Sequence, residues 1–366
     1  RVGDAEIQTA AKSVDSKLKA AIRFAHRNIR DFHQRGLRKG WNGQNAQGAR
    51  VGEKYDAFDR VGIYIPGGTA PLMSTALMTL TLAKVAGCRE IVVCTPCDKD
   101  GEINLGLLHA ARFAGATEVY RVGGAHAIAA LALGTKTIAP VQKIFGPGNA
   151  YVVAAKRQLV GRVSIDLLPG PSELLVLADA SANPAYAAAD ILAQAEHGSG
   201  SERCWLISTS SKIIAAVKKE IEKQLSGQSR RKYIQKALKK HCWLIQVKSL
   251  AESISLANRL APEHCELMLK NHKEVAKKIV TAGALFLGND SPTVTGDYVA
   301  GPSHTLPTGG AGASFQGLTV DMFQRRTSVV QYSKAALKKS ISVIDQFAEI
   351  EGLYAHGRSA SIRLNP

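Results

Sequence analysis

The sequence predicts an α/β protein with two parallel sheets and small helical segments at its two ends. From residue 61 to about residue 290, short apolar runs alternate with longer segments of helical period. The short runs are continuous and rich in β-branched residues, which is typical of strands covered by helices on both faces. Because 366 residues are too many for one small core, the alternation predicts two sheets rather than one.

The first predicted sheet occupies residues 61–173. Its helices alternate regularly with its strands, and Gly87 ends the first helix, as glycine often does. Short β-α-β units of this kind predict parallel strands joined by right-handed crossovers. The expected strands are 61–66, 90–94, 118–122, 143–145 and 163–168, and the expected helices are 70–87, 103–115, 125–134 and 149–161.

The pattern restarts in the second predicted sheet, residues 174–290. Asn183 and Pro184 supply the N-cap and first-turn proline of a helix that Gly198 closes. An internal duplication would produce two such halves, although no letter-for-letter repeat connects them. Residues 319–366 are expected to be helical, and the first 60 residues to be helical and then irregular. The remaining expected elements are strands 174–179, 204–209, 242–247, 265–269 and 284–288, and helices 212–225, 250–260 and 272–283.

The formal net charge of +17 raises the question of a nucleic-acid partner. Much of the excess lies in residues 26–40 and 218–240, where Lys and Arg are interleaved with an apolar helical period. No aromatic RNA-binding signature or zinc-finger spacing accompanies them. We therefore expect solvated helix faces and no nucleic-acid partner, with a basic nucleic-acid-binding α/β protein as a remote alternative. No run approaches the ~20 uncharged apolar residues of a membrane-spanning helix, so no membrane partner is expected.

The six cysteines lie mostly in apolar, strand-like runs. We expect buried free thiols, which suit a reducing, cytoplasmic compartment. Cys94 and Cys97 form a CxxC, but no second CxxC accompanies them, so a redox or zinc role there is a weak alternative. The chain does not begin with Met, so the question of a targeting segment upstream of residue 1 stays open.

Four Gly-rich segments fall at predicted strand ends. They are residues 65–71, 122–127, 145–151 and 167–173. None is a GxGxxG that follows a strand, and each alone is more often a tight turn than a ligand loop. Together they predict a binding crevice beyond the carboxyl ends of the strands, where backbone can approach a phosphate or ribose.

Polar groups suited to acid–base or metal chemistry are scattered along the second half. Glu263 and His264 are adjacent in what we expect to be a βα loop. They are either an acid–base pair or a surface Glu beside a capping His. Gln194 and His197 stand three apart on a final helical turn. A long irregular stretch, 295–310, carries Asp297 and His304, and Glu351 and His356 stand five apart near the end. His197, Asp297 and His356 are plausible metal donors, but spacing alone does not bring them together.

These segments together closely resemble histidinol dehydrogenase, from about residue 61 to residue 364. The resemblance implies a zinc-dependent homodimer with intertwined subunits that oxidises L-histidinol to L-histidine with two NAD molecules, through the aldehyde. It also implies two Rossmann-like domains without the standard dinucleotide fingerprint. The blocks that carry it are SIDLLPGPSELLVLADASANPAYAAADILAQAEHG, APEHCEL, GDYVAGPSHTLPTGG and EGLYAHGRSASIRL.

The resemblance implies a role for each matching residue. The catalytic pair would be Glu263 and His264. The zinc ligands would be Gln194, His197, Asp297 and His356. These four residues and the catalytic pair would also contact the substrate. Ser172, His304 and Glu351 would line the substrate pocket, and Glu351 and His356 would come from the second subunit. The cofactor would lie near Tyr64, the 122–127 turn and Asn149, where His126 replaces the family's usual Gln.

We expect three domains. The first Rossmann-like domain would combine residues 1–63 with 174–318, and the second would be residues 64–173. Residues 319–366 would form a helical C-terminal domain that contributes to the partner's site. A relative that oxidises another alcohol, such as a sulfonated diol, is the alternative function; the presence of Glu351 and of the whole zinc set favours histidinol.

Overall fold

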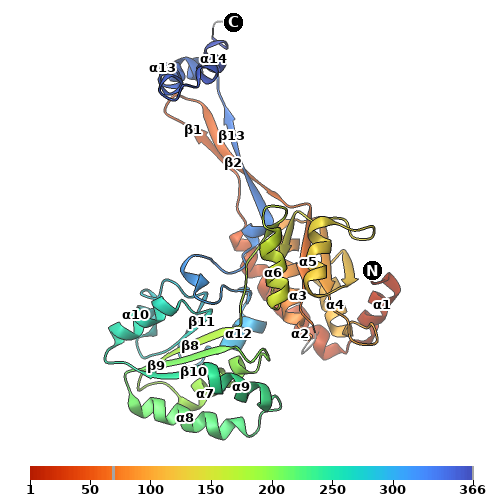
Figure 1. Ribbon diagram of the computed structural model, residues 1–366, viewed down its shortest axis with the longest axis vertical. Helices are drawn as coiled ribbons and strands as arrows, with labels where there is room; N and C mark the ends of the chain where they lie inside the picture. The colour runs from red at the N-terminus through yellow and green to blue at the C-terminus, as the bar shows by residue number, and fades with distance from the viewer. Residues whose placement is uncertain (68–70, 365–366) are drawn as a thin grey trace. The chain divides into compact units, whose positions relative to one another are not determined.

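The computed structural model describes residues 1–67 and 71–364, and its contacts divide the chain into two units (Figure 1). The first unit combines residues 1–36 with 58–323, and the second combines residues 37–57 with those from 324 onward. No helix in the described part of the chain is long and apolar enough to cross a membrane.

The first unit contains the first predicted sheet, with all five strands parallel in the order β5-β4-β3-β6-β7. Helices α3 and α4 cover one face and α5 and α6 the other (Figure 1). Nine consecutive residues of α3 are buried, because α2 and α4 also pack on it. The strands are β3 (Arg60–Tyr64), β4 (Glu90–Thr95), β5 (Glu118–Arg121), β6 (Lys143–Phe145) and β7 (Ser164–Ile165), and the helices are α3 (Met73–Ala86), α4 (Leu105–Phe113), α5 (Gly124–Leu133) and α6 (Ala150–Leu159).

The second predicted sheet is also present in the first unit, parallel in the order β10-β9-β8-β11-β12. Apolar side chains of α7, α8 and α9 pack against one face, and those of α10 and α11 against the other. The strands are β8 (Glu173–Ala178), β9 (Arg203–Ser208), β10 (Cys242–Gln246), β11 (His264–Met268) and β12 (Ala284–Leu287), and the helices are α7 (Pro184–Ala195), α8 (Ser211–Leu225), α9 (Arg231–His241), α10 (Leu250–Leu260), α11 (His272–Ala276) and α12 (Thr293–Tyr298). The predicted pair of Rossmann-like sheets is confirmed.

The second unit differs from the helical prediction, because it contains a three-stranded antiparallel sheet. Strand β2 (Arg50–Ala57) lies between β1 (Trp41–Gln44) and β13 (Gln324–Gln331). Residues 37–57 are therefore partly a hairpin rather than irregular, and residues 319–366 are not wholly helical. Strand β13 has no buried side chain, so it lacks the apolar pattern by which a strand is read from sequence. Helices α13 (Lys334–Ile350) and α14 (Tyr354–Ser361) follow it.

The first predicted domain boundary also differs from the structure. Residues 63 and 64 both belong to β3, so a division between them would cut a strand of the first sheet. The N-terminal helices α1 (Asp4–Ser13) and α2 (Ser16–His33) pack on α4 and α3, which cover that sheet. Helix α2 also contacts residues 299–301, where Asn28 Nδ2 donates to the Val299 carbonyl at 2.8 Å. Residues 1–36 therefore belong with the first sheet, because that is where their apolar faces are buried.

Candidate active site

A cavity of about 360 Å³ lies between the two sheets of the first unit. One wall follows the carboxyl ends of β3 and β6, where the strand order of the first sheet reverses. The other wall precedes β8 and β11, the central pair of the second sheet, and so lies at their amino ends. The first wall includes Pro66, Leu72, Ser74, Thr75, Pro147 and Gly148, and the second includes Ser172, His197, Arg230, Glu263, His264, Asp297 and His304.

The Glu263 carboxylate is buried immediately before β11. The Ser172 hydroxyl donates to its Oε2 at 2.5 Å, and the Glu173 backbone N–H donates to the same oxygen at 2.8 Å. Burial raises the pKa of Glu263, although the nearby His264 imidazole and these two hydrogen bonds oppose the change. A carboxylate with a raised pKa that reaches a cavity is suited to act as a general base.

The His264 imidazole is held in one tautomer beside this carboxylate. Its Nδ1 donates to the Glu173 carbonyl at 2.9 Å and lies 3.6 Å from Glu263 Oε2. With the proton on Nδ1, Nε2 of the neutral ring is left to accept a proton. The adjacent pair therefore occupies one cavity as predicted, but it ends an αβ connection after α10 rather than lying in a βα loop.

Helix α7 positions Gln194 and His197 at its C-terminal end. The helix begins at the predicted cap: the Asn183 side chain accepts the Ala185 N–H at 3.0 Å, and Pro184 occupies the first turn. It ends at Ala195, so His197 follows the helix instead of belonging to its last turn. His197 Nδ1 donates to the Gln194 carbonyl at 2.9 Å, which leaves Nε2 available as a metal ligand. The Gln194 side chain is buried, with Nε2 3.4 Å from His197 Nδ1.

Asp297 and His304 approach the cavity from α12 and the segment after it. His304 Nδ1 donates to the Asp297 carbonyl at 3.1 Å, and its Nε2 lies 3.2 Å from Thr75 Oγ1 on α3. Burial lowers the pKa of His304, so the ring is neutral near pH 7. The Thr75 contact joins the two walls, and nothing in the sequence pattern marked this threonine as a site residue.

Six predicted site residues thus line one cavity, and Gln194 is next to them. Glu351 caps α13 and His356 lies on α14; both are exposed residues of the second unit and neither is among the lining residues. Among residues 1–67 and 71–364, no three His, Cys, Asp or Glu side chains form a group that could hold a metal ion. In one chain, therefore, the predicted zinc set is represented at the cavity by Gln194, His197 and Asp297.

The three predicted cofactor residues lie at the carboxyl edge of the first sheet. The Tyr64 hydroxyl, at the end of β3, accepts the Gly124 N–H at 3.1 Å at the start of α5. Asn149 caps α6 by accepting two backbone N–H groups at its Oδ1, which leaves its Nδ2 group for a ligand. His126 is exposed on the first turn of α5. Residues 68–70 of the Gly-rich segment 65–71 lie outside the described residues.

The Cys94–Cys97 motif has a structural explanation. Burial raises the pKa of the Cys94 thiol to about 12, so it is not a reactive thiolate. Pro96 fills the space between two turns: a Cβ on Gly67 or on Gly123 would lie 2.7 Å from a Pro96 side-chain carbon. The prediction of buried free thiols is confirmed for Cys88, Cys94, Cys204 and Cys265, whereas Cys242 is half-buried and Cys97 is exposed.

Two further residues with a part in the site were not predicted. The Glu173 backbone holds both members of the acid–base pair, and its side chain is tied to Arg203 at 3.1 Å. Arg230, before α9, lines the cavity with its guanidinium over the Tyr233 ring. Glu173 stands within the Gly-rich segment 167–173, which pointed to the site, whereas Arg230 lies in a basic stretch expected to be only a solvated face.

Known proteins that are similar to this chain are histidinol dehydrogenases. A profile of the histidinol dehydrogenase family matches residues 1–364. The chain is 44% identical over 364 residues to a histidinol dehydrogenase of Geobacillus kaustophilus (strain HTA426), spanning 100% of this chain and 86% of that protein. It is 46% identical over 365 residues to one from Heliobacterium mobile, spanning 100% and 85%.

Solved structures extend the comparison. The crystal structure of histidinol dehydrogenase from Elizabethkingia anophelis matches with a TM-score of 0.96 and 38% identity, over 100% of this chain and 84% of that one. An acetylating aldehyde dehydrogenase from Geobacillus thermoglucosidasius matches with a TM-score of 0.53 and 16% identity, over 90% and 94%. The second likeness is one of fold alone.

Proposed function

The chain belongs to the histidinol dehydrogenase family and is an NAD-dependent oxidoreductase that converts L-histidinol to L-histidine, and we propose that the cavity between the two sheets is where it does so. The observation that carries this proposal is the arrangement of Glu263 and His264. Both side chains reach one cavity, and both are oriented by the backbone of Glu173.

In the first oxidation, His264 is the base. Its Nδ1–H is committed to the Glu173 carbonyl, so Nε2 accepts the hydroxyl proton of histidinol while the carbinol carbon loses hydride. NAD, when bound, accepts that hydride, and the product of the step is the aldehyde histidinal.

In the second oxidation, Glu263 is the base that activates water. Its raised pKa makes it a stronger base than an ordinary carboxylate, and the Ser172 and Glu173 donors hold Oε2 in place. Attack of that water on the aldehyde carbon, with its proton passing to Glu263, gives a hydrate. From this hydrate His264 would again accept a hydroxyl proton while a second NAD, when bound, accepts the hydride. The product is the carboxylate of histidine.

The donors near His197 fit a zinc ion. A backbone carbonyl accepts from His197 Nδ1, as is common for metal-bound histidines, and the Asp297 carboxylate in the same cavity would supply an oxygen ligand. Gln194 would add a neutral amide oxygen and His356 of a second subunit an imidazole. Zinc bound there would hold the amino and imidazole nitrogens of histidinol and so place its carbinol carbon.

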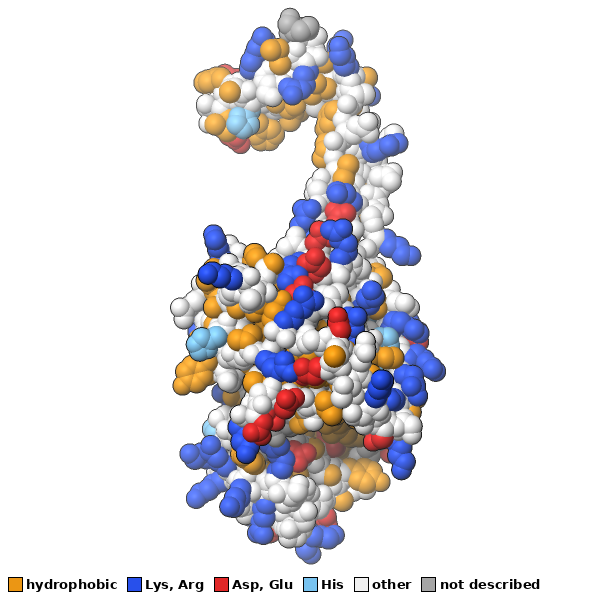
Figure 2. All heavy atoms as spheres, turned by 90° about the vertical axis from the view of Figure 1, so that its right-hand side faces the viewer, with side chains coloured by type: hydrophobic (Ala, Val, Ile, Leu, Met, Phe, Trp, Pro, Cys, Tyr) orange, Lys and Arg blue, Asp and Glu red, His pale blue; other side chains and the backbone are white. Residues whose placement is uncertain are grey.

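A homodimer with shared sites would complete this ligand set. The second unit exposes large apolar side chains, including Val330, Phe347, Ile350 and Tyr354, at 61–81% of their full area. Figure 2 shows hydrophobic side chains on the surface of this unit among charged ones. A surface of this kind suits a second copy of the chain, which would bring Glu351 and His356 to the substrate.

The shared site has a direct test by subunit mixing. His197→Ala and His356→Ala are prepared separately, unfolded, mixed in equal amounts and refolded together. If His356 acts on the partner's site, half of the dimers are mixed and each has one intact site, so about a quarter of wild-type activity returns. If His356 acts within its own subunit, no intact site forms and no activity returns.

The activity itself is tested by NADH absorbance with L-histidinol, with and without a zinc chelator. We expect two NADH per histidinol, and loss of turnover on chelation that added Zn²⁺ reverses. A purified dimer that reduces NAD with another alcohol but not with histidinol would contradict the proposal. On the face shown in Figure 2, Lys and Arg side chains are spread out rather than gathered in one patch.

The His at residue 126 concerns NAD binding. His126 can still donate one hydrogen bond in place of the family's usual Gln, so we expect altered NAD affinity or pH dependence rather than loss of activity.

Four buried free thiols and a step of histidine synthesis are consistent with a reducing, cytoplasmic location.

A further inference from the structure

A buried ion pair, Lys156 on α6 with Asp166 after β7, takes no part in the chemistry described above. Both side chains are completely buried, and neither residue lines the cavity. Burying two opposite charges is costly, and apolar side chains of similar size are often as stable in such a place. The stability of the fold therefore does not by itself explain the pair.

The pair binds the backbone of two different loops. Lys156 Nζ donates to the Gly146 carbonyl at 2.8 Å and to the Leu167 carbonyl at 3.2 Å. Asp166 contacts Lys156 through Oδ1 and accepts the Gly146 N–H at Oδ2, at 2.7 Å. Both polar groups of the Gly146 backbone are thus held by one ion pair, and the start of segment 167–172 is held with them.

Gly146 is packed closely against the end of β3. Its φ of +106° suits glycine, and a Cβ there would lie 2.0 Å from the Tyr64 carbonyl oxygen. The end of β3, which carries the cofactor candidate Tyr64, is therefore packed directly against the clamped peptide.

Each clamped loop leads within a few residues to a different part of the site. Gly146 is followed by Pro147 and Gly148 in the cavity wall and then by Asn149, the cap of α6. On the other side, Gly170 N–H donates to Thr308 Oγ1 at 2.5 Å. Ser172, two residues further on, donates to the Glu263 carboxylate. Segment 167–172 is also the connection between the two sheets, from β7 to β8.

We propose that Lys156 and Asp166 are positioning residues that set the distance between the NAD-binding loop 146–149 and the segment that orients Glu263. This inference rests on the proposed function, because it assigns loop 146–149 to NAD. The pair joins the first sheet to the start of the inter-sheet connection, so the two walls of the cavity keep one spacing while hydride is transferred. Such spacing matters because rates fall steeply when reacting atoms are misplaced by about 1 Å.

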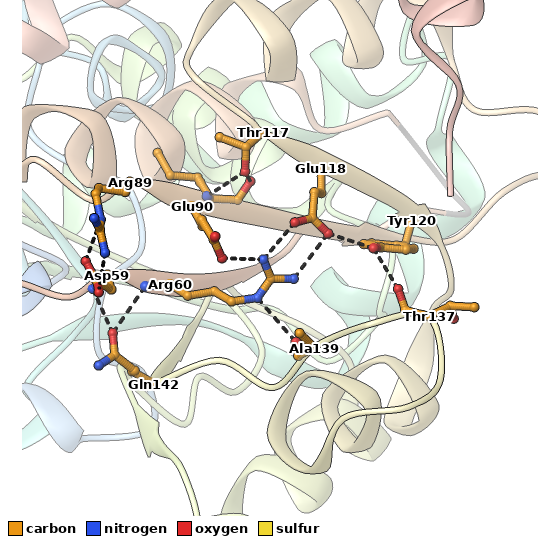
Figure 3. Close-up of polar contacts among 11 residues, drawn as sticks. Asp59, Arg60, Arg89, Glu90, Thr117, Glu118, Tyr120, Thr137, Ala139 and Gln142 are labelled. Carbon is orange, nitrogen blue, oxygen red and sulfur yellow. Dashed lines mark hydrogen bonds and ion pairs between the residues drawn. The ribbon is translucent and has the colours of Figure 1, made fainter.

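The test replaces both charges at once, so that no lone charge is buried. In Lys156→Met/Asp166→Leu the hydrogen bonds to Gly146 and Leu167 are lost; Met is close in size to Lys, whereas Leu is larger than Asp. The matched control is Arg60→Met/Glu118→Leu, a partly buried pair at the opposite, amino edge of the same sheet, where Arg60 also contacts Glu90 (Figure 3). Circular dichroism and thermal unfolding establish that both variants are folded.

Three measurements separate positioning from folding. Hydrogen exchange of the zinc-loaded, NAD-free enzyme reports on residues 146–149 and 167–172, where we expect exchange about tenfold faster in the Lys156/Asp166 variant only. Titration with NAD in the absence of histidinol is expected to give a Kd raised about tenfold. Turnover is expected to fall about a hundredfold in kcat, with KM for histidinol within about twofold of wild type. The Arg60/Glu118 control should change none of these.

A folded Lys156/Asp166 variant with unchanged exchange, Kd and kcat would overturn the proposal. If that variant does not fold, Lys156→Gln/Asp166→Asn is measured in its place. Its neutral amides can keep part of the hydrogen bonding, so intermediate values are expected, and wild-type values in all three measurements would overturn the proposal. Failure of the proposed function would be seen separately, as wild-type enzyme that does not turn over histidinol, while the exchange measurement is independent of turnover.

Discussion

The two walls of the cavity come from opposite ends of two similar sheets. At the carboxyl edge of the first sheet, loops 145–149 and 65–67 offer backbone, glycine and proline, followed by the N-terminal ends of helices. At the amino edge of the second sheet, Glu263, His264 and His197 offer titratable side chains held by backbone hydrogen bonds.

The difference follows from what each edge can provide. Helix N-termini such as those of α5 and α6 carry partial positive charge, which suits the phosphates of a dinucleotide. The C-terminal end of α7, beside His197, carries partial negative charge, which favours a cation such as zinc. Under the proposed function, one edge would therefore bind the anionic cofactor and the other would hold the metal and move protons.

The largest expected effect is on the second wall, from Glu263→Gln. The amide cannot accept the proton of the attacking water, so oxidation of supplied histidinal should fall about 10²–10⁴-fold. Oxidation of histidinol to histidinal should fall much less, as measured by stopped-flow NADH formation. Glu196→Gln, which changes a carboxylate in the same cavity, is the control and should leave both steps near wild type. Equal losses in the two steps would contradict the assigned role.

Next in size is the loss of metal from His197→Ala. Removal of a zinc ligand should weaken zinc binding about a hundredfold or more and abolish turnover, while circular dichroism stays unchanged. Zinc content after gel filtration is the measurement. His272→Ala is the control, because this histidine is also held through Nδ1 by a backbone carbonyl, that of Leu269, but lies outside the cavity. Full zinc occupancy in the His197 variant would refute the ligand assignment.

A moderate effect is expected on pH dependence. Burial raises the pKa of Glu263, and the base is active only when ionised, so the rate of histidinal oxidation should rise with pH through that raised pKa and then level off. Ser172→Ala removes a donor that stabilises the ionised form, so the rise should move to higher pH. Ser208→Ala, a buried serine at the far end of β9, should not move it. A shift to lower pH in the Ser172 variant would be inconsistent with this account.

The smallest expected effects are on stability at the amino edge of the first sheet. Arg60 contacts Glu90 and Glu118, and Glu118 also accepts the Tyr120 hydroxyl (Figure 3). Arg60→Met should lower the free energy of unfolding by about 2 kcal/mol with kcat unchanged, as measured by urea denaturation. The exposed pair Arg89–Asp59 in the same figure is the comparison, and Arg89→Met should lower the free energy of unfolding much less, because solvent screens an exposed pair. A loss of kcat in the Arg60 variant would mean that this edge also serves the site.

Several local features were predictable because neighbouring residues determine them. Gly87 ends α3 in a left-handed conformation, and Asn183 caps α7. The predicted end of α7 was too late, because the helix stops at Ala195 and Gly198 adopts its left-handed φ only after His197. Strand β13 was missed because its pairing with β2 depends on backbone hydrogen bonds to a segment more than 260 residues away.

The sequence by itself determined the alternation of strands and helices, the positions of several caps, and the residue types able to carry acid–base and metal chemistry. Each depends on periodicity or on contacts within a few residues. Only the tertiary structure decided that Ser172 and Glu263 meet, because strands β8 and β11 pair in parallel with Leu174 opposite His264. That register, set by packing across the sheet, brings residues 91 apart into hydrogen-bond contact and places the acid–base pair at the amino edge rather than the carboxyl edge.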